Sequence, residues 1–87
     1  MKTLNQTIID VRSAGEFLGG QIEGSINIPV NRILDHIDEI KRLPQPLILC
    51  CASGSRSSLA TLFLRNSGIS CENGGSWNNI SYKFQTV

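Results

Sequence analysis

The chain has 87 residues, of which 40% are hydrophobic and 17% charged, and its formal net charge is +1. These values predict one domain over residues 1–87, with no bias toward nucleic acid and no apolar run near the roughly 20 residues of a membrane span. Three cysteines, one histidine and no Cys-x-x-Cys motif argue against a disulfide framework or a zinc site, so we expect no metal.

The N-terminal third predicts a strand, a short helix and a second strand. Residues 1–7 lack the apolar segment of a secretory signal, so the chain, if it is complete, is expected in the cytoplasm. The β-branched run over residues 7–11 predicts a strand. Ser13 and Glu16 have the spacing of a capping box, which predicts a short helix starting there. Residues 25–28 predict another strand, which a proline ends.

The middle of the chain predicts a helix and then a buried strand. Apolar residues repeat at helical spacing from Val30 to Ile40, which predicts one amphipathic helix that ends before Pro44. Residues 47–50 are apolar without interruption, which is typical of a strand covered on both faces.

The last third predicts a second long helix and a final strand. The helix is expected from about Ser57 to Asn66 or Ser67, with a buried side formed by four residues, Leu59, Ala60, Leu62 and Phe63. Residues 69–72 predict a strand, and residues 73–76 predict a turn before Trp77.

The alternation of strands and helices predicts an α/β fold. We expect a small parallel sheet of about four strands with helices on both faces. In such folds the reactive site lies outside the carboxyl ends of the strands. Two segments lie at such ends, Asp10 to Arg12 and the region that starts at Cys51.

A cysteine pair, Cys50 and Cys51, stands where the buried strand ends and the next helix begins. Small residues follow, and Arg56 closes the loop. Such a loop holds an anion or a thiolate on backbone N–H groups at a helix N-terminus. The helix end and Arg56 both favour the charged form of a nearby thiol, so a cysteine of low pKa is expected here.

Three segments, in order, carry the signature of one family. Residues 9–12 and 16–17 resemble its "DVR…E-aromatic" motif, residues 20–29 its "GHIxGAxNIP" segment, and residues 51–57 its "CxxGxRS" loop. The chain therefore resembles a rhodanese-homology domain of the small, single-domain thiosulfate sulfurtransferase type. Gln21 replaces a usual histidine, and the N-terminal strand and helix of relatives are missing, so we expect a minimal rhodanese-like fold.

The resemblance implies a sulfurtransferase that works through a persulfide on Cys51. The donor would be thiosulfate or a persulfide, and the acceptor a thiophile such as cyanide, a thiol or thioredoxin, with no cofactor. The resemblance assigns six residues to the substrate-binding loop: Ala52, Ser53, Gly54, Ser55, Arg56 and Ser57. Asp10 and Arg12 are expected to form an anchoring pair, and Trp77 to combine a core role with a place at the rim of the site.

Other interpretations stay open at the level of the sequence. The spacing from Cys50 to Arg56 is that of protein tyrosine phosphatases, whereas Gly54 is in phase with Cys51. A third hypothesis is a non-catalytic rhodanese-like binding or sensing module. Cys50 is expected to pack in the strand, with a secondary role as the thiol that resolves the Cys51 persulfide. Glu16 is expected to cap its helix, with Arg12 as a candidate second partner.

Overall fold

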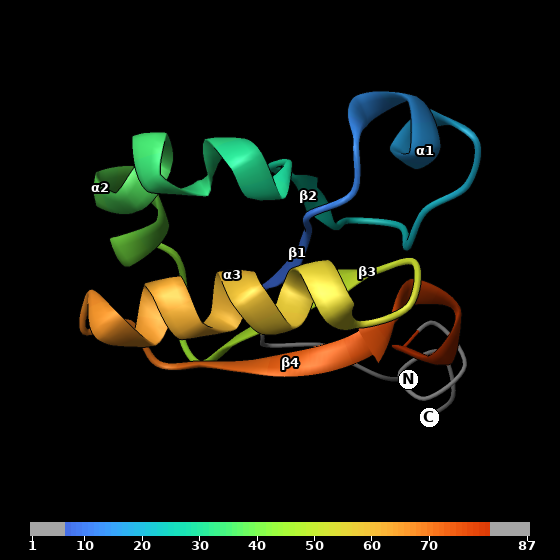
Figure 1. Cartoon of the computed structure of the whole chain (residues 1–87). Coiled ribbons are helices and arrows are strands. Elements are labelled where there is room, and N and C mark those ends of the chain that lie inside the picture. Colours follow the sequence, from blue (N-terminus) through green and yellow to red (C-terminus); the bar gives the residue numbers. More distant parts are fainter. Residues whose placement is uncertain (1–6, 81–87) are drawn as a thin grey trace, which may run out of the picture.

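A computed structural model describes residues 7–80, which form a four-stranded parallel sheet with helices (Figure 1). The strands are β1 (Ile8–Asp10), β2 (Ile26–Asn27), β3 (Leu47–Cys51) and β4 (Cys71–Ser76), in the spatial order β2-β1-β3-β4. The helices are α1 (Ala14–Leu18), the 3-10 helix η1 (Val30–His36), α2 (Ile37–Lys41) and α3 (Ser55–Asn66). The α/β class and the parallel sheet predicted from the sequence are confirmed.

The two faces of the sheet bury different side chains, because successive residues of a strand point to opposite faces. Ile9, Leu49 and Cys51 belong to the larger core, which contains residues of η1, α2 and α3. Ile8, Ile48 and Cys50 belong to a second cluster on the other face. A helical stretch over residues 77–80 and the segment before β2 cover that second face, through Trp77, Ile80 and Ile22.

The carboxyl ends of β1 and β3 meet at one edge of the sheet, as expected for parallel neighbours. Asp10 is the register partner of Cys50, and the Val11 N–H donates to the Cys50 carbonyl at 2.8 Å. The chain after β1 leads into α1, and the chain after β3 leads into α3 (Figure 1). Both sequence segments singled out for chemistry therefore leave the sheet at the same edge.

The amphipathic helix predicted after β2 is divided into two short helices. Residues 30–36 form η1, and α2 follows directly, with a change of backbone conformation at His36 (φ −118°, ψ 18°). Val30 and Ile33 are three residues apart, which suits the three-residue turn of a 3-10 helix. The predicted inward face is correct for Ile33 and Ile40, which are fully buried, and wrong for Leu34, which is 60% exposed.

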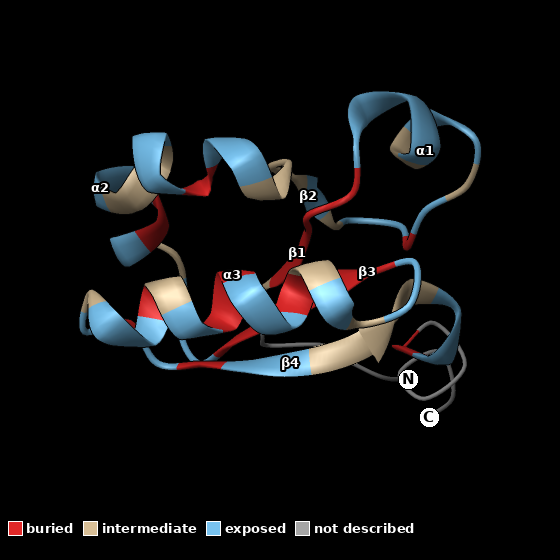
Figure 2. Cartoon of the chain, viewed as in Figure 1, coloured by how far each residue is buried: buried red, intermediate tan, exposed pale blue. Residues whose placement is uncertain are grey.

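The predicted buried side of α3 is partly wrong. Leu59 and Leu62 are 47% and 55% exposed, whereas Ala60 is buried as expected. The buried stripe also includes Ser57, Thr61 and Leu64 (Figure 2). Most of these side chains are small or polar, so hydrophobicity alone did not identify the whole buried stripe. Within residues 7–80, no helix is long and apolar enough to cross a membrane.

The turn predicted over residues 73–76 is the second half of β4. A Cβ atom at Gly74 would lie 2.7 Å from Ile48 Cγ2 and would also overlap the Ile80 side chain. The register of β4 against β3 shifts between Leu49 and Cys50, where Gly75 adopts a left-handed φ of 86°. The two glycines therefore serve close packing and a register shift in a strand.

Candidate active site

Cys51 is the last residue of β3, and the loop that follows wraps around its sulfur. The Gly54 N–H donates to Cys51 Sγ at 3.0 Å, and the Ser57 N–H donates at 3.4 Å. The Ser57 hydroxyl lies 3.5 Å from the same sulfur. Gly54 has a left-handed φ of 101°, which turns its N–H back toward the cysteine. The sulfur therefore lies in a cradle of donors at the N-terminus of α3.

These donors set the protonation of Cys51. Burial by itself raises the pKa of the Cys51 thiol, because it penalises the thiolate. The hydrogen bonds from the Ser57 hydroxyl and from the N–H groups of Ser57, Gly54 and Ser53 outweigh burial, so the pKa of Cys51 lies below its ordinary value. Cys51 is fully buried, and its lowered pKa increases the fraction of thiolate, the nucleophilic form.

Cys50 has the opposite environment, although it is the preceding residue. Its side chain belongs to the apolar cluster on the other face of the sheet. Burial, together with the charge of Asp10, raises the pKa of Cys50 to about 12. Cys50 therefore stays a neutral thiol on the face away from the loop, an environment that does not favour a nucleophilic or resolving role. Cys71 is buried in the core, as expected.

Asn73 of β4 fixes the loop, a role that was not predicted from the sequence. Its Oδ1 accepts from the Ser57 hydroxyl at 2.6 Å and from the Gly75 N–H at 3.0 Å. Its Nδ2 donates to the Gly54 carbonyl at 3.1 Å. A single amide thereby holds two of the residues that donate to Cys51, Ser57 and Gly54. In the sequence Asn73 is followed by two glycines, a pattern typical of a turn, so no signal marked it as a strand residue.

Arg56 does not point an unpaired charge at the loop, because it forms a two-fold ion pair with Glu16 of α1. The distances are 2.7 Å from Nη1 to Oε1 and 3.0 Å from Nη2 to Oε2. The hydrogen bonds from Arg56 are the largest cause of the low pKa of Glu16, which is about 2. The capping box between Ser13 and Glu16 is confirmed, whereas Arg12 is not the second partner of Glu16. α1 buries none of its residues (Figure 2), and this ion pair links it to the first turn of α3.

Asp10 and Arg12 form the anchoring pair expected from the sequence, and it is buried. Arg12 donates from Nη2 to Asp10 Oδ2 at 2.8 Å and from the same nitrogen to the Gly20 carbonyl at 2.6 Å. The guanidinium lies 4.5 Å from the centre of the Trp77 ring, a cation–π arrangement. Trp77, half-buried, therefore lies against Arg12 and the Cys50 cluster.

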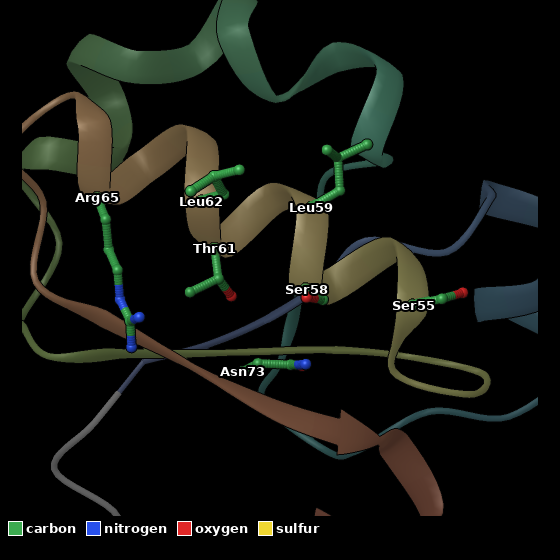
Figure 3. A pocket seen from close by; sticks show the side chains of 7 residues that line it. All are labelled: Ser55, Ser58, Leu59, Thr61, Leu62, Arg65 and Asn73. Carbon is green, nitrogen blue, oxygen red and sulfur yellow. The ribbon is translucent and has the colours of Figure 1, made fainter.

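The outer surface of the loop is neutral. Ala52, Ser53 and Ser55 are exposed, and the two serine hydroxyls lie 3.2 Å apart. A shallow hollow of about 420 Å³ continues from Ser55 along α3 and β4 (Figure 3). Its lining is Ser55, Ser58, Leu59, Thr61, Leu62, Arg65 and Asn73. Cys51 is not part of that lining.

Within the described part of the chain, no three His, Cys, Asp or Glu side chains gather as metal ligands.

Comparisons with known proteins show the family and the fold. The family model of the rhodanese-like domain matches residues 1–82. The uncharacterized protein YqhL of Bacillus subtilis is 41% identical over 61 residues, which cover 70% of this chain and 48% of YqhL. The chain thus spans about half the length of this curated relative.

Two solved structures share the fold. A rhodanese from E. coli, determined with anions, has a TM-score of 0.73 and 27% identity over 87% of this chain and 92% of that chain. The human single-domain sulfurtransferase TSTD1 has a TM-score of 0.70 and 23% identity, over 91% of this chain and 83% of that chain. The second likeness concerns the fold alone.

Proposed function

The chain belongs to the rhodanese-like domain family, and on this premise we propose that it is a sulfurtransferase that carries sulfur as a persulfide on Cys51. One observation carries the proposal: Cys51 Sγ receives hydrogen bonds from the N–H groups of Gly54 and Ser57 at the start of α3. The same donors lower the pKa of the Cys51 thiol despite its burial, so the thiolate is available as a nucleophile.

In the first step the Cys51 thiolate attacks the outer, sulfane sulfur of thiosulfate or of a persulfide. The new bond joins Cys51 Sγ to that sulfur, while the donor's S–S bond breaks and its electron pair leaves with sulfite or a thiolate. In the second step cyanide, a thiol or a thioredoxin-like protein attacks the outer sulfur and releases the Cys51 thiolate. Both steps are nucleophilic transfers of a sulfur atom that need no external oxidant or reductant, so no cofactor is required.

The persulfide is proposed to lie where the loop places its backbone donors. N–H groups at the N-terminus of α3 stabilise negative charge on the outer sulfur in the same way as they stabilise a bound anion. Asn73 keeps the cradle in place through Ser57 and the Gly54 carbonyl.

The test is intact mass spectrometry of the whole protein after incubation with thiosulfate or an alkyl persulfide. We expect an adduct with the mass of one sulfur atom, located by peptide mapping on Cys51. The adduct should be lost in Cys51→Ser and kept in Cys50→Ser, which is the matched control. Release of the sulfur on addition of cyanide or a thiol should accompany loss of the adduct.

Absence of an adduct with both donors in the folded protein would contradict the proposal. That result, together with specific binding of a partner protein, would favour a non-catalytic module. Phosphoester hydrolysis that is lost in Cys50→Ser and kept in Cys51→Ser would favour the phosphatase instead.

A further inference from the structure

Among residues 7–80, the charges near the loop are compensated within the protein itself. The loop over residues 51–57 contains one charged side chain, Arg56, and both of its outer nitrogens are paired with the Glu16 carboxylate. Arg12, at the same edge of the sheet, is paired with Asp10 and stacked on Trp77. Each of these cations therefore has a carboxylate partner before any substrate arrives.

The leaving group of the sulfur donor has to lie among uncharged loop side chains. Cys51 has no exposed surface, so a donor whose outer sulfur reaches Sγ brings its next atom among the loop residues. The side chains there are the Ala52 methyl group and the Ser53 and Ser55 hydroxyls, which can donate hydrogen bonds but carry no charge.

The two donor classes differ in the charge that they bring to this place. Thiosulfate carries two negative charges within three bonds of the attacked sulfur and leaves as the sulfite dianion. A persulfide, R–S–S⁻, carries one and leaves as a thiolate, R–S⁻. With the Cys51 thiolate, the reacting group holds three negative charges for thiosulfate and two for the persulfide. Where no uncompensated cation is present, the added like charge is repelled, and low local dielectric strengthens that repulsion.

On the premise of the proposed function, we propose that this site takes persulfides in preference to thiosulfate, and that Glu16 sets the preference by neutralising Arg56. Glu16 is a positioning residue, since it acts through Arg56 and does not touch Cys51. The donor is defined by its chemistry as a persulfide whose carbon chain bears no anionic group next to the sulfur. The transfer is balanced: Cys51–S⁻ and R–S–S⁻ give Cys51–S–S⁻ and R–S⁻.

The test measures the loading of Cys51 with thiosulfate and with 2-hydroxyethyl persulfide, a donor whose alkyl chain carries no charge. Each kcat/KM is divided by the uncatalysed rate of the same donor with a free thiol, because persulfides are intrinsically more reactive. The normalised ratio should favour the alkyl persulfide in the native protein. In Glu16→Gln, which can keep the capping hydrogen bonds, the thiosulfate value should rise roughly two- to fivefold, as expected for one released exposed charge.

Two controls separate charge from structure. Asp35→Asn removes the carboxylate of an exposed ion pair with Arg32, on η1, and changes net charge equally. Ser13→Ala removes the cap of α1 but leaves the Arg56 pair. Neither should shift the donor ratio. High salt should narrow the gap between the donors in the native protein and have less effect in Glu16→Gln.

The outcomes are distinct. Equal or higher normalised loading by thiosulfate in the native protein overturns the inference and leaves the proposed function intact, since Cys51 is still loaded. The same holds if Glu16→Gln leaves the ratio unchanged, or if Asp35→Asn moves it as far. Failure of both donors to load Cys51 defeats the proposed function and the inference with it.

Discussion

Cys50 and Cys51 are adjacent in the chain and both fully buried, yet the structure gives them opposite chemistry. Cys51 faces the side of the sheet where the loop and the N-terminus of α3 supply hydrogen-bond donors. Cys50 faces the other side, among isoleucines and Trp77, next to the carboxylate of Asp10. Burial raises the pKa of both thiols, and donors reverse that effect on one side only.

The comparison shows that burial does not decide whether a thiol is reactive. What decides is whether the surroundings hold dipoles aimed at the sulfur when it is charged. The loop side does so through backbone N–H groups, whose positions depend on Gly54 and Asn73. On the Cys50 side, the apolar cluster packs against the sheet, and the Asp10–Arg12 pair anchors the chain after β1. Substitutions on each face test this difference between the two sides.

The largest expected effect is on stability and lies on the Cys50 side. Asp10→Asn removes the charge partner of Arg12, whose side chain is 5% exposed. Leaving a buried charge unpaired costs about 3–5 kcal/mol, so the free energy of unfolding should fall by that amount. Urea unfolding of the purified variant measures it. The exposed Asp35→Asn should change little, because exposed pairs contribute little; similar losses in both variants would contradict the assignment.

The next effect lies on the Cys51 side. Gly54→Ala forces a side chain onto a φ of 101° and brings a Cβ atom within 3.2 Å of Gly75 Cα. Strain of this kind costs roughly 1–3 kcal/mol, and the displaced N–H should also raise the pKa of Cys51. Thermal unfolding and thiol alkylation as a function of pH measure the two effects.

Gly24→Ala is the matched control for that variant, because Gly24 also has a left-handed φ, 86°, with open space around its Cα. It should lower stability and leave the alkylation profile of Cys51 unchanged. An alkylation profile that moves equally in both variants would mean that the Gly54 N–H does not stabilise the thiolate.

A smaller effect is expected from the hydroxyl of Ser57. Ser57→Ala removes the hydroxyl that lies 3.5 Å from Cys51 Sγ and that donates to Asn73 Oδ1, the amide that supports the loop. The pKa of Cys51 should therefore rise toward its ordinary value, and alkylation at neutral pH should slow by up to about tenfold. The sign follows from the thiolate being the reactive form: alkylation increases as pH rises through the pKa, and the native profile reaches its plateau at lower pH than that of the variant. Ser58→Ala, at an exposed neighbour, should leave the profile unchanged.

The smallest effect on the site is expected from Cys50. Cys50→Ala should lower the free energy of unfolding by about 1 kcal/mol, through the lost sulfur contacts, and leave the alkylation profile of Cys51 unchanged. In the native protein Cys50 should be alkylated only after unfolding, because its pKa is raised to about 12. Alkylation of folded Cys50 at neutral pH would remove the contrast between the two faces.

The order of elements and the edge that carries the site were predictable from local patterns. Alternating strand and helix signals predicted the parallel sheet, and the motif over residues 51–57 separated the two cysteines by the phase of Gly54. The capping box of Ser13 and Glu16 was also predictable, since it depends on residues three apart. Such features depend on residues close together in the chain, so they can be predicted from local sequence patterns.

Tertiary contacts decided the rest. The pairing of Glu16 with Arg56 joins residues 40 positions apart, and nothing local distinguishes Arg56 from Arg12 as its partner. Asn73 reaches the loop because β4 stays paired with β3 through Gly74 and Gly75. Local sequence preference predicts a turn at these two glycines. The sequence by itself determined which cysteine follows the family's spacing. Only the packed sheet, by turning adjacent side chains to opposite faces, determined which donors and charges surround each sulfur and therefore each pKa.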